Sequence, residues 1–377
     1  WSKATEYSGK SLQIQTAIGD RQGIASVMGN LGTVYFHQGE WSKAIVYYEK
    51  SLQIQTALGD RQGLAAIYGN MGETYRLQGE WAKAIEYSEK SLQIQTALMD
   101  RQGIASVMGN LGSVYFQQGE WSKAIEHYEK SLQIQTALGD RQGMANQLGN
   151  LGNIYRHQGE WSKAIEYSEK SLQIHTALGY RQGVASVMGN LGSVYLQQGE
   201  WSKAIKYSEK SLQIHTALGD RQGVATQLGN LGNVYLHQGD AIKGVETLEK
   251  CLSIKREIGE AFAVMQTLLV LAEAYLETGK TEKALSYLNE AEPLTVKFQQ
   301  RQCIEIIQEL RQAVEGVSND PRFTIIRILS EIAGEDAMKK GLESALKEIM
   351  ESPEKMAMFM EKVSDSGIDL EDLADRD

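Results

Sequence analysis

Apolar residues in the stretch 101–140 recur at helical spacing in two segments separated by a glycine. In the first segment they fall every three or four positions, at Ile104, Val107, Met108, Leu111, Val114 and Tyr115. The second segment has the same spacing, at Trp121, Ala124, Ile125, Tyr128, Leu132 and Ile134. Gly119 lies between the segments and Gly139 follows the second, and glycine readily adopts the left-handed conformation that ends many helices. The stretch therefore predicts a helical hairpin.

The same hairpin returns along the chain with a period of forty residues. The period is marked by all six tryptophans, Trp1, Trp41, Trp81, Trp121, Trp161 and Trp201. A fixed period of this size is typical of an array in which each repeat is one supersecondary unit packed on its neighbours. No proline occurs before Pro293, which suits long uninterrupted helices. We therefore expect an all-α protein built from stacked hairpins.

The hairpin pattern resembles the tetratricopeptide repeat at Leu111, Gly112, Tyr115, Gly119, Ala124, Tyr128 and Leu132. The resemblance implies a right-handed α-solenoid over residues 1–316. It also implies that the two helices cross closely at Gly112 and Ala124, with tyrosines filling the space around the crossing. The repeats have forty residues instead of about 34, and the proline that normally ends the second helix is absent. In both respects they are similar to the long-helix subclass found in kinesin light chain and Pins-type adaptors.

The regularity of the repeats divides the chain into four segments. Residues 1–240 are near-identical repeats that start in the middle of a hairpin. Residues 241–316 are divergent repeats closed by a capping helix after Pro293, at about 294–316, because terminal repeats of an array are atypical. We expect residues 317–363 to form a short helical appendage and residues 364–377 to form an acidic, disordered tail.

The first hairpin lacks its first helix, so we expect the chain to be a fragment of a longer protein. Residues 1–20 would then expose an apolar face that includes Leu12 and Ile14. We expect this uncapped end to fray or to self-associate with another copy.

One asparagine never changes on the first helix of each hairpin. It recurs as Asn30, Asn70, Asn110, Asn150, Asn190 and Asn230. On a helical wheel Asn110 shares one side with Ser106, Ser113 and Gln117, and the resemblance implies that this side faces a concave groove. An amide both donates and accepts hydrogen bonds, so it can hold a peptide bond, and the series resembles the asparagine ladder of O-GlcNAc transferase. A structural bond to the neighbouring hairpin is the open alternative.

Positions beside the asparagines vary, whereas the second-helix sequence KSLQI returns unaltered six times. A uniform scaffold with a variable inner wall is the layout of a binding array. The wall residues that we take as candidate ligand contacts are Glu73, Arg76, Phe116, Asn153, Arg156, His157 and Asn233. The forked guanidinium groups of Arg76 and Arg156 are predicted to select acidic side chains on the partner. Drift after duplication of an eighty-residue block is the alternative explanation of the variation.

Charge and cysteine content narrow the partner class. The formal net charge is −10, and residues 1–240 balance to zero, so no basic surface for nucleic acid or anionic membrane is expected. The two cysteines, Cys251 and Cys303, have no metal-binding spacing and suggest a reducing compartment, so we expect a cytoplasmic location. The apolar runs are too short to span a bilayer. A protein or peptide partner, acidic in character, fits these constraints.

No catalytic motif is found in the chain, and no cofactor is expected. His175 and His215 occupy the slot of Gln135, and a surface Gln-to-His substitution is favoured over a metal pair. The Asp140-Arg141 step is interpreted as a solvated contact between repeats. The leading hypothesis is a non-enzymatic scaffold that captures an extended peptide or a partner helix in its groove. The alternatives are the sensor array of a signalling ATPase or caspase-like protease, and an architectural rod that self-assembles.

Overall fold

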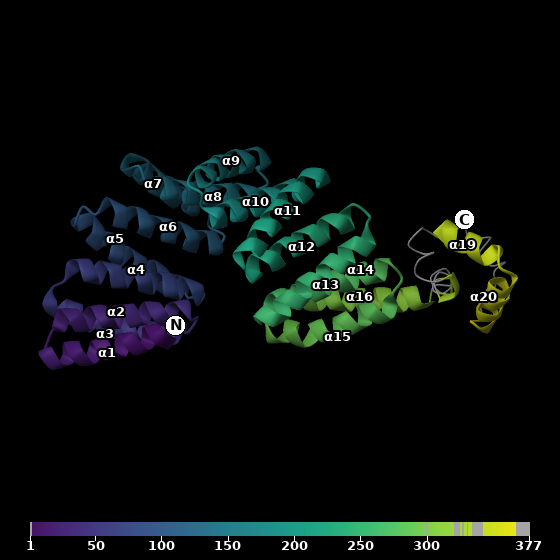
Figure 1. Ribbon diagram of the computed structural model, residues 1–377, viewed down its shortest axis with the longest axis horizontal. Coiled ribbons are helices and arrows are strands. Elements are labelled where there is room, and N and C mark those ends of the chain that lie inside the picture. Colours follow the sequence, from purple (N-terminus) through teal and green to yellow (C-terminus); the bar gives the residue numbers. More distant parts are fainter. Residues whose placement is uncertain are drawn as a thin grey trace. The chain divides into compact units, whose positions relative to one another are not determined.

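The computed structural model describes residues 2–298, 300–319, 325, 328–329, 331–333 and 342–366. Within these ranges the ordered elements are helices, and none is a strand. Consecutive helices pack pairwise as hairpins, so the all-α solenoid prediction is confirmed. Figure 1 shows the successive hairpins side by side.

The chain divides into two compact units, Trp1–Val194 and Tyr195–Asp377. The division falls inside a helix of the near-identical repeats. The segment divisions at residues 240, 316 and 363 stay predictions from the periodicity. Unit 1 holds α1 Ser2–Ile18, α2 Arg21–His37, α3 Trp41–Leu58, α4 Arg61–Leu77, α5 Trp81–Ala97, α6 Arg101–Gln117, α7 Trp121–Leu138, α8 Arg141–His157, α9 Trp161–Ala177 and most of α10 Arg181–Gln197.

Unit 2 begins within the last turn of α10 and continues the hairpin pattern. Its further described helices are α11 Trp201–Leu218, α12 Arg221–His237, α13 Ala241–Ile258, α14 Ala261–Glu277, α15 Thr281–Lys297, α16 Arg301–Asn319, α19 Leu342–Met350 and α20 Pro353–Asp365. Leu329 and Ala333 form a small separate core with Ala345 and Ile349 of α19, and Met356 and Phe359 of α20 pack against it. The predicted tail lies outside the described residues from 367 onward, and α20 reaches Asp365.

An aspartate starts most first helices, and a glycine follows most second helices. The Oδ1 atom of Asp140 accepts a hydrogen bond of 2.9 Å from the Gly143 N–H, which satisfies one of the free donors of the first turn of α8. This aspartate is therefore a helix cap, and it also accepts a bond from Gln102, so its role is structural. Gly139 has a φ of 70°, which confirms the predicted glycine stop.

The two helices of a hairpin cross where the sequence predicts. A Cβ atom on Gly112 would lie 2.7 Å from Cδ1 of the Tyr128 ring, closer than carbon atoms approach, and Ala124 is fully buried. The second helix is constant for a related reason that the sequence did not reveal. Ser131 is buried, and its hydroxyl donates to the Ala105 carbonyl at 2.7 Å. Constancy of KSLQI therefore reflects packing against the first helix.

The end of the regular array differs from the prediction. Pro293 lies inside α15 and does not end a helix there, and the next helix is α16, Arg301–Asn319, not 294–316. Proline removes one backbone donor but keeps a φ that suits a helix. Ala291 and Thr295, on either side of Pro293, are fully buried and hold the last turn of α15 against its neighbours.

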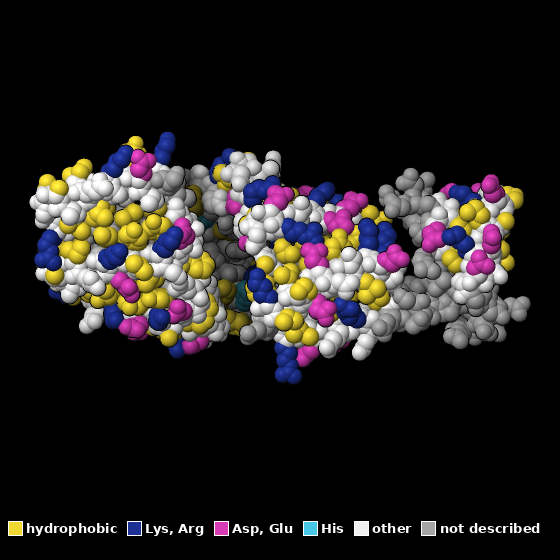
Figure 2. All heavy atoms as spheres, turned by 90° about the horizontal axis from the view of Figure 1, so that it is seen from below, with side chains coloured by type: hydrophobic (Ala, Val, Ile, Leu, Met, Phe, Trp, Pro, Cys, Tyr) yellow, Lys and Arg dark blue, Asp and Glu magenta, His cyan; other side chains and the backbone are white. Residues whose placement is uncertain are grey.

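The first described helix, α1, has several exposed apolar side chains. Tyr7, Ile14 and Ile18 are each more than 60% exposed. In Figure 2, which views the molecule from below, hydrophobic side chains gather on the unit 1 face. Ile14 is therefore exposed as expected, whereas Leu12 is partly buried. Whether this end frays or self-associates stays a prediction.

Candidate functional site

The first helices of unit 1 lie on the side where successive hairpins come closest. Helix α2 contacts α4 directly, and α4 contacts α6. The invariant asparagines lie on the surface of these helices and not in the core. Asn30 and Asn70 are exposed, and the other four, Asn110, Asn150, Asn190 and Asn230, are partly buried. A ligand on this face would therefore meet a row of primary amides.

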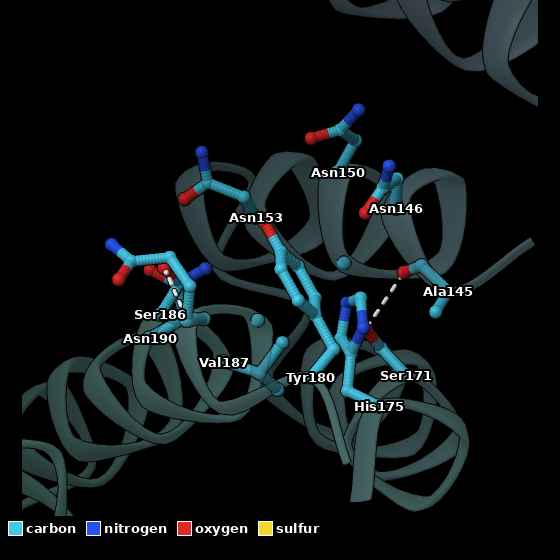
Figure 3. Close-up of a pocket in the computed structure, with 13 residues that line it drawn as sticks. Ala145, Asn146, Asn150, Asn153, Ser171, His175, Tyr180, Ser186, Val187 and Asn190 are labelled. Carbon is cyan, nitrogen blue, oxygen red and sulfur yellow. Dashed lines mark hydrogen bonds between the residues drawn. The ribbon is translucent and has the colours of Figure 1, made fainter. Parts of the chain in front are cut away.

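A pocket of about 370 Å³ opens between α8 and α10. Three predicted site residues line it, Asn150, Asn153 and Asn190. The α9 residues Ser171 and His175 also line the pocket, and Figure 3 shows the ring of Tyr180 rising through its middle. The structure thus brings two neighbouring members of the invariant asparagine series, Asn150 and Asn190, to one cavity. Its volume is within the range of small-ligand sites.

The hydrogen bonds of the asparagines bear on whether they are structural. Asn150 Nδ2 donates to Gln147 Oε1 at 3.4 Å, a long bond to a residue of its own helix. This bond does not tie Asn150 to a neighbouring hairpin, and it uses one of the hydrogen-bonding positions of the amide. Asn150 is one of the residues that line the pocket, and Figure 3 shows its amide pointing away from the rings of Tyr180 and His175.

The structure distinguishes the two arginines that the sequence treated as equivalent. Arg76 makes a two-point pair with Glu73, Nε to Oε2 at 2.8 Å and Nη2 to Oε1 at 2.6 Å, and this bonding raises the pKa of the guanidinium. Its side chain is only 15% exposed. The carboxylate that Arg76 was predicted to select on a partner is therefore supplied by its own helix.

Arg156 has a different environment. It donates to Asn153 Oδ1 from Nη2 at 2.9 Å and to His157 Nε2 at 2.7 Å. Burial lowers the pKa of the guanidinium, and within the described residues no carboxylate is paired with it. Burial, together with the nearby positive charge of Arg156, lowers the pKa of His157. Arg156 is thus a partly desolvated cation that retains the ability to bind an anion.

Phe116 and His157 form an aromatic contact beside Arg156. The Phe116 ring meets the His157 imidazole edge-on at 5.2 Å between centroids, and Trp121 lies 6.5 Å from the same imidazole. The predicted residues Phe116, Arg156 and His157 therefore come together from α6 and α8. Asn233 is on α12 of unit 2 and is partly buried.

The position that His175 and His215 share on the second helix is not at the surface, so the interpretation as a surface Gln-to-His substitution was wrong. His175 and His215 are 3% and 4% exposed. Each lies beneath the first turn of the following helix, where a Cβ atom on Gly183 or Gly223 would lie within 2.6 Å of the imidazole. Close packing against these glycines explains the burial. The described part of the chain contains no group of His, Cys, Asp or Glu suited to a metal ion.

One residue of this region was missed, although its signal was visible in the sequence. Five of the six linkers place aspartate before the RQG sequence, at Asp20, Asp60, Asp100, Asp140 and Asp220. The remaining linker has Tyr180, which lines the pocket. A single departure from an otherwise constant cap position is the signal that could have been used.

Solved structures of low sequence identity share this fold. A quorum sensor, NprR from B. thuringiensis in its apo form, is 17% identical with a TM-score of 0.61, over 75% of this chain and 80% of its own. The Rap conjugation gene regulator of plasmid pLS20, in complex with the Phr* peptide, is 16% identical with a TM-score of 0.56, over 78% and 77%.

A third similar structure is a signal transduction ATPase with numerous domains that has a tetratricopeptide repeat sensor, from Pyrococcus horikoshii. It is 18% identical with a TM-score of 0.58, over 78% of this chain and 46% of that protein. A comparison with curated protein sequences gave no match. Among the described residues, no helix is long and apolar enough to cross a membrane.

A family model covers nearly the whole array. The tetratricopeptide repeat model matches residues 1–57, 63–137, 143–217 and 223–295. These matches begin in the first described hairpin and extend into α15. The chain therefore belongs to the tetratricopeptide repeat family.

Proposed function

We propose that this chain is a protein-interaction scaffold that binds an extended peptide across the surface of its first helices. The observation that carries the proposal is the row of invariant asparagines on the first helices of unit 1, from Asn30 to Asn190, on a scaffold whose constant second helices are explained by packing. Packing does not account for the asparagines in the same way, because they are exposed or only partly buried. An amide side chain can hold the N–H and C=O groups of a peptide backbone together.

Similarity to proteins that bind peptides supports this proposal at the level of the fold. One similar structure is described as a complex with the Phr* peptide, and another as a quorum sensor. Peptide capture by this chain rests on its own asparagines. The neighbours make a peptide the first ligand to test.

The partner is proposed to be acidic near Arg156. This guanidinium is partly desolvated and holds neutral groups, Asn153 and His157, where Arg76 holds a carboxylate. An acidic side chain of a ligand can replace the bonds to Asn153 with a charge-assisted pair. Of the two arginines, Arg156 is therefore the one that selects acidic side chains on the ligand.

A second function is a ligand-sensing array within a larger signalling protein. It is favoured by the similarity to the sensor-containing ATPase, of which this chain covers 46%. The two functions share the same binding surface, and they differ in what the binding controls.

The test is binding of a library of fluorescein-labelled extended peptides, measured by anisotropy. Substituting Asn70→Ala together with Asn110→Ala should weaken every bound peptide by about tenfold, because two hydrogen bonds of about 0.5–1.5 kcal/mol each are lost. A matched control is Lys50→Ala, an exposed position on the second helix. If the asparagine variant stays folded by circular dichroism and binds every peptide as the control does, this surface is not the binding site.

A further inference from the structure

Two repeats place a buried histidine in the same slot but differ in the residue that follows five positions later. In unit 2, His215 Nδ1 donates to Asp220 Oδ2 at 2.7 Å. The other oxygen of that carboxylate, Oδ1, accepts from the Gly223 N–H at 2.9 Å. One carboxylate therefore satisfies both a buried imidazole and the first turn of α12.

In the preceding repeat the carboxylate is replaced by an aromatic ring. Tyr180 packs against His175 with ring centroids 5.3 Å apart, and its Cδ1 atom lies 2.6 Å from where a Cβ of Gly183 would be. In the equivalent linker of α8, Asp140 Oδ2 holds that place at 2.5 Å. His175 is 3% exposed, and its Nδ1 atom has no hydrogen-bond partner in the described structure. A buried polar atom without a partner costs free energy, so a group that could pair with it would be stabilising.

The pocket opens at this same place. Its lining includes His175, Tyr180 and Gly183, together with the polar side chains of Asn150, Ser186 and Asn190 (Figure 3). Replacement of aspartate by tyrosine also removes a negative charge that would repel an anion. The positive end of the α10 helix dipole and the backbone donors of its first turn lie beside the imidazole.

We infer that this pocket binds a carboxylate of the partner, which takes at His175 and the first turn of α10 the contacts that Asp220 makes at His215 and α12. Tyr180 and Gly183 both pack against the imidazole, so binding moves the Tyr180 ring aside. The inference rests on the proposed peptide binding only for the source of the carboxylate, an acidic side chain or a C-terminus. The carboxylate contact itself does not depend on the invariant asparagines.

The experiment uses the full chain with ¹³C-labelled histidine and follows the imidazole Cε1–H resonance of His175 by NMR. Acetate and acetamide are the probes, because they match in shape and differ in charge. Acetate should shift the resonance saturably and about tenfold more tightly than acetamide, since a charged acceptor forms the stronger bond. His175→Gln, the residue found in four of the six repeats, assigns the resonance by removing it.

Exchanging the residues found at positions 180 and 220 provides matched controls. Tyr180→Asp should abolish the acetate response, because an internal carboxylate then fills the site. Asp220→Tyr should create a second response, at His215. Asn70→Ala should leave the acetate response unchanged, so loss of peptide binding in that variant tests the ladder alone. No His175 response to acetate, an equal response to acetamide, or a response retained in Tyr180→Asp would each overturn the inference.

Two peptides identify the source of the carboxylate. Acetyl-Gly-Gly-Asp-Gly-Gly-amide carries only a side-chain carboxylate, and N-acetylated pentaglycine carries only a terminal one. The inference expects at least one of them to shift His175 and the Tyr180→Asp variant to lose that shift. If neither peptide shifts the resonance although acetate does, the pocket is not a partner site, and the inference fails while the ladder proposal stands.

Discussion

Two kinds of hairpin alternate in unit 1. They differ in the second-helix residue that packs against the first helix beside the variable position. In α6–α7 the second helix carries Tyr128, whose ring packs against Gly112 and whose hydroxyl lies 3.0 Å from Ser113 Oγ. Hairpin α2–α3 repeats this arrangement, with Tyr48 donating to Thr33 at 3.3 Å. In these hairpins the wall position is a small hydroxyl that meets a buried tyrosine.

The other kind of hairpin has serine in place of that tyrosine. In α4–α5 Gly72 faces Ser88, and the wall position is Glu73, which pairs with Arg76. In α8–α9 Gly152 faces Ser168, and Asn153 pairs with Arg156. In these four hairpins the wall residue and the residue packed under it therefore change together. Part of the variation that the sequence assigned to ligand choice is set by packing within the hairpin.

The largest expected effect comes from converting one kind of hairpin into the other. Tyr128→Ser should lower the free energy of unfolding by about 3 kcal/mol or more, because a ring only 3% exposed is replaced by a cavity. Ser88→Ala, in the serine hairpin, should lower it by less than about 1 kcal/mol. Urea denaturation measures both, with hydrogen exchange of α6 and α7 for Tyr128→Ser and of α4 and α5 for Ser88→Ala. Similar losses in the two variants would mean that the hairpins are equivalent after all.

Substitution of Arg76 should mainly reduce stability, whereas substitution of Arg156 should mainly reduce the binding of acidic peptides. Arg76→Ala should destabilise the chain by about 1–3 kcal/mol, because Glu73 is left partly buried without its partner. Arg156→Ala should cost less stability, because it leaves neutral groups behind, and should weaken acidic peptides about tenfold with a dependence on salt. Thermal melts and anisotropy titrations at two ionic strengths give the comparison. The reverse pattern would show that Arg76 is the selective residue.

The linker comparison predicts a gain in stability. Tyr180→Asp should raise the free energy of unfolding by about 1 kcal/mol, because it supplies the helix cap and pairs with His175. Asp140→Ala should lower it by a similar amount, since it removes the cap bond to the Gly143 N–H. Chemical denaturation of both variants is sufficient. A destabilised Tyr180→Asp variant would mean that the Tyr180 ring packs more favourably than the cap bonds.

The smallest effect concerns a single strained linker residue. Met99 has a φ of 56° where the other second helices of the near-identical repeats end in glycine, and its side chain is 84% exposed. Met99→Gly should stabilise the chain by about 0.5–1 kcal/mol, because a side chain in the left-handed region is unfavourable. Gly139→Ala should lose a similar amount. If thermal melts find Met99→Gly destabilising, contacts of the methionine outweigh the backbone strain.

The sequence predicted the fold well because its signals are local and repeated. The spacing of Leu111, Gly112 and Ala124, repeated many times, determines which helix faces meet, and the structure confirms the crossing. Pro293 misled the prediction of the capping helix, because the burial of Ala291 and Thr295 outweighs the loss of one backbone donor.

The site was less predictable, since it depends on contacts between residues distant in sequence. The helical wheel placed Asn110 away from the buried face of its helix, as in the structure, but it could not reveal that Arg76 is already paired with Glu73. Burial of His175 depends on the backbone of Gly183 in the following helix, which no pattern within one helix shows. Tyr180 could be recognised in the sequence as an exception to the aspartate caps. Only the structure shows that it lines the pocket.

The central claim is that the asparagines hold the backbone of a peptide, whatever side chains it carries. The most direct measurement compares a bound peptide with versions of it that are N-methylated at alternate residues, which removes backbone N–H donors and leaves the side chains unchanged. The account predicts that N-methylation weakens binding to the unaltered chain by about tenfold, and that this difference shrinks in the Asn110→Ala/Asn150→Ala variant. Equal binding of the methylated and unmethylated peptides, or the same loss in both forms of the chain, would contradict it.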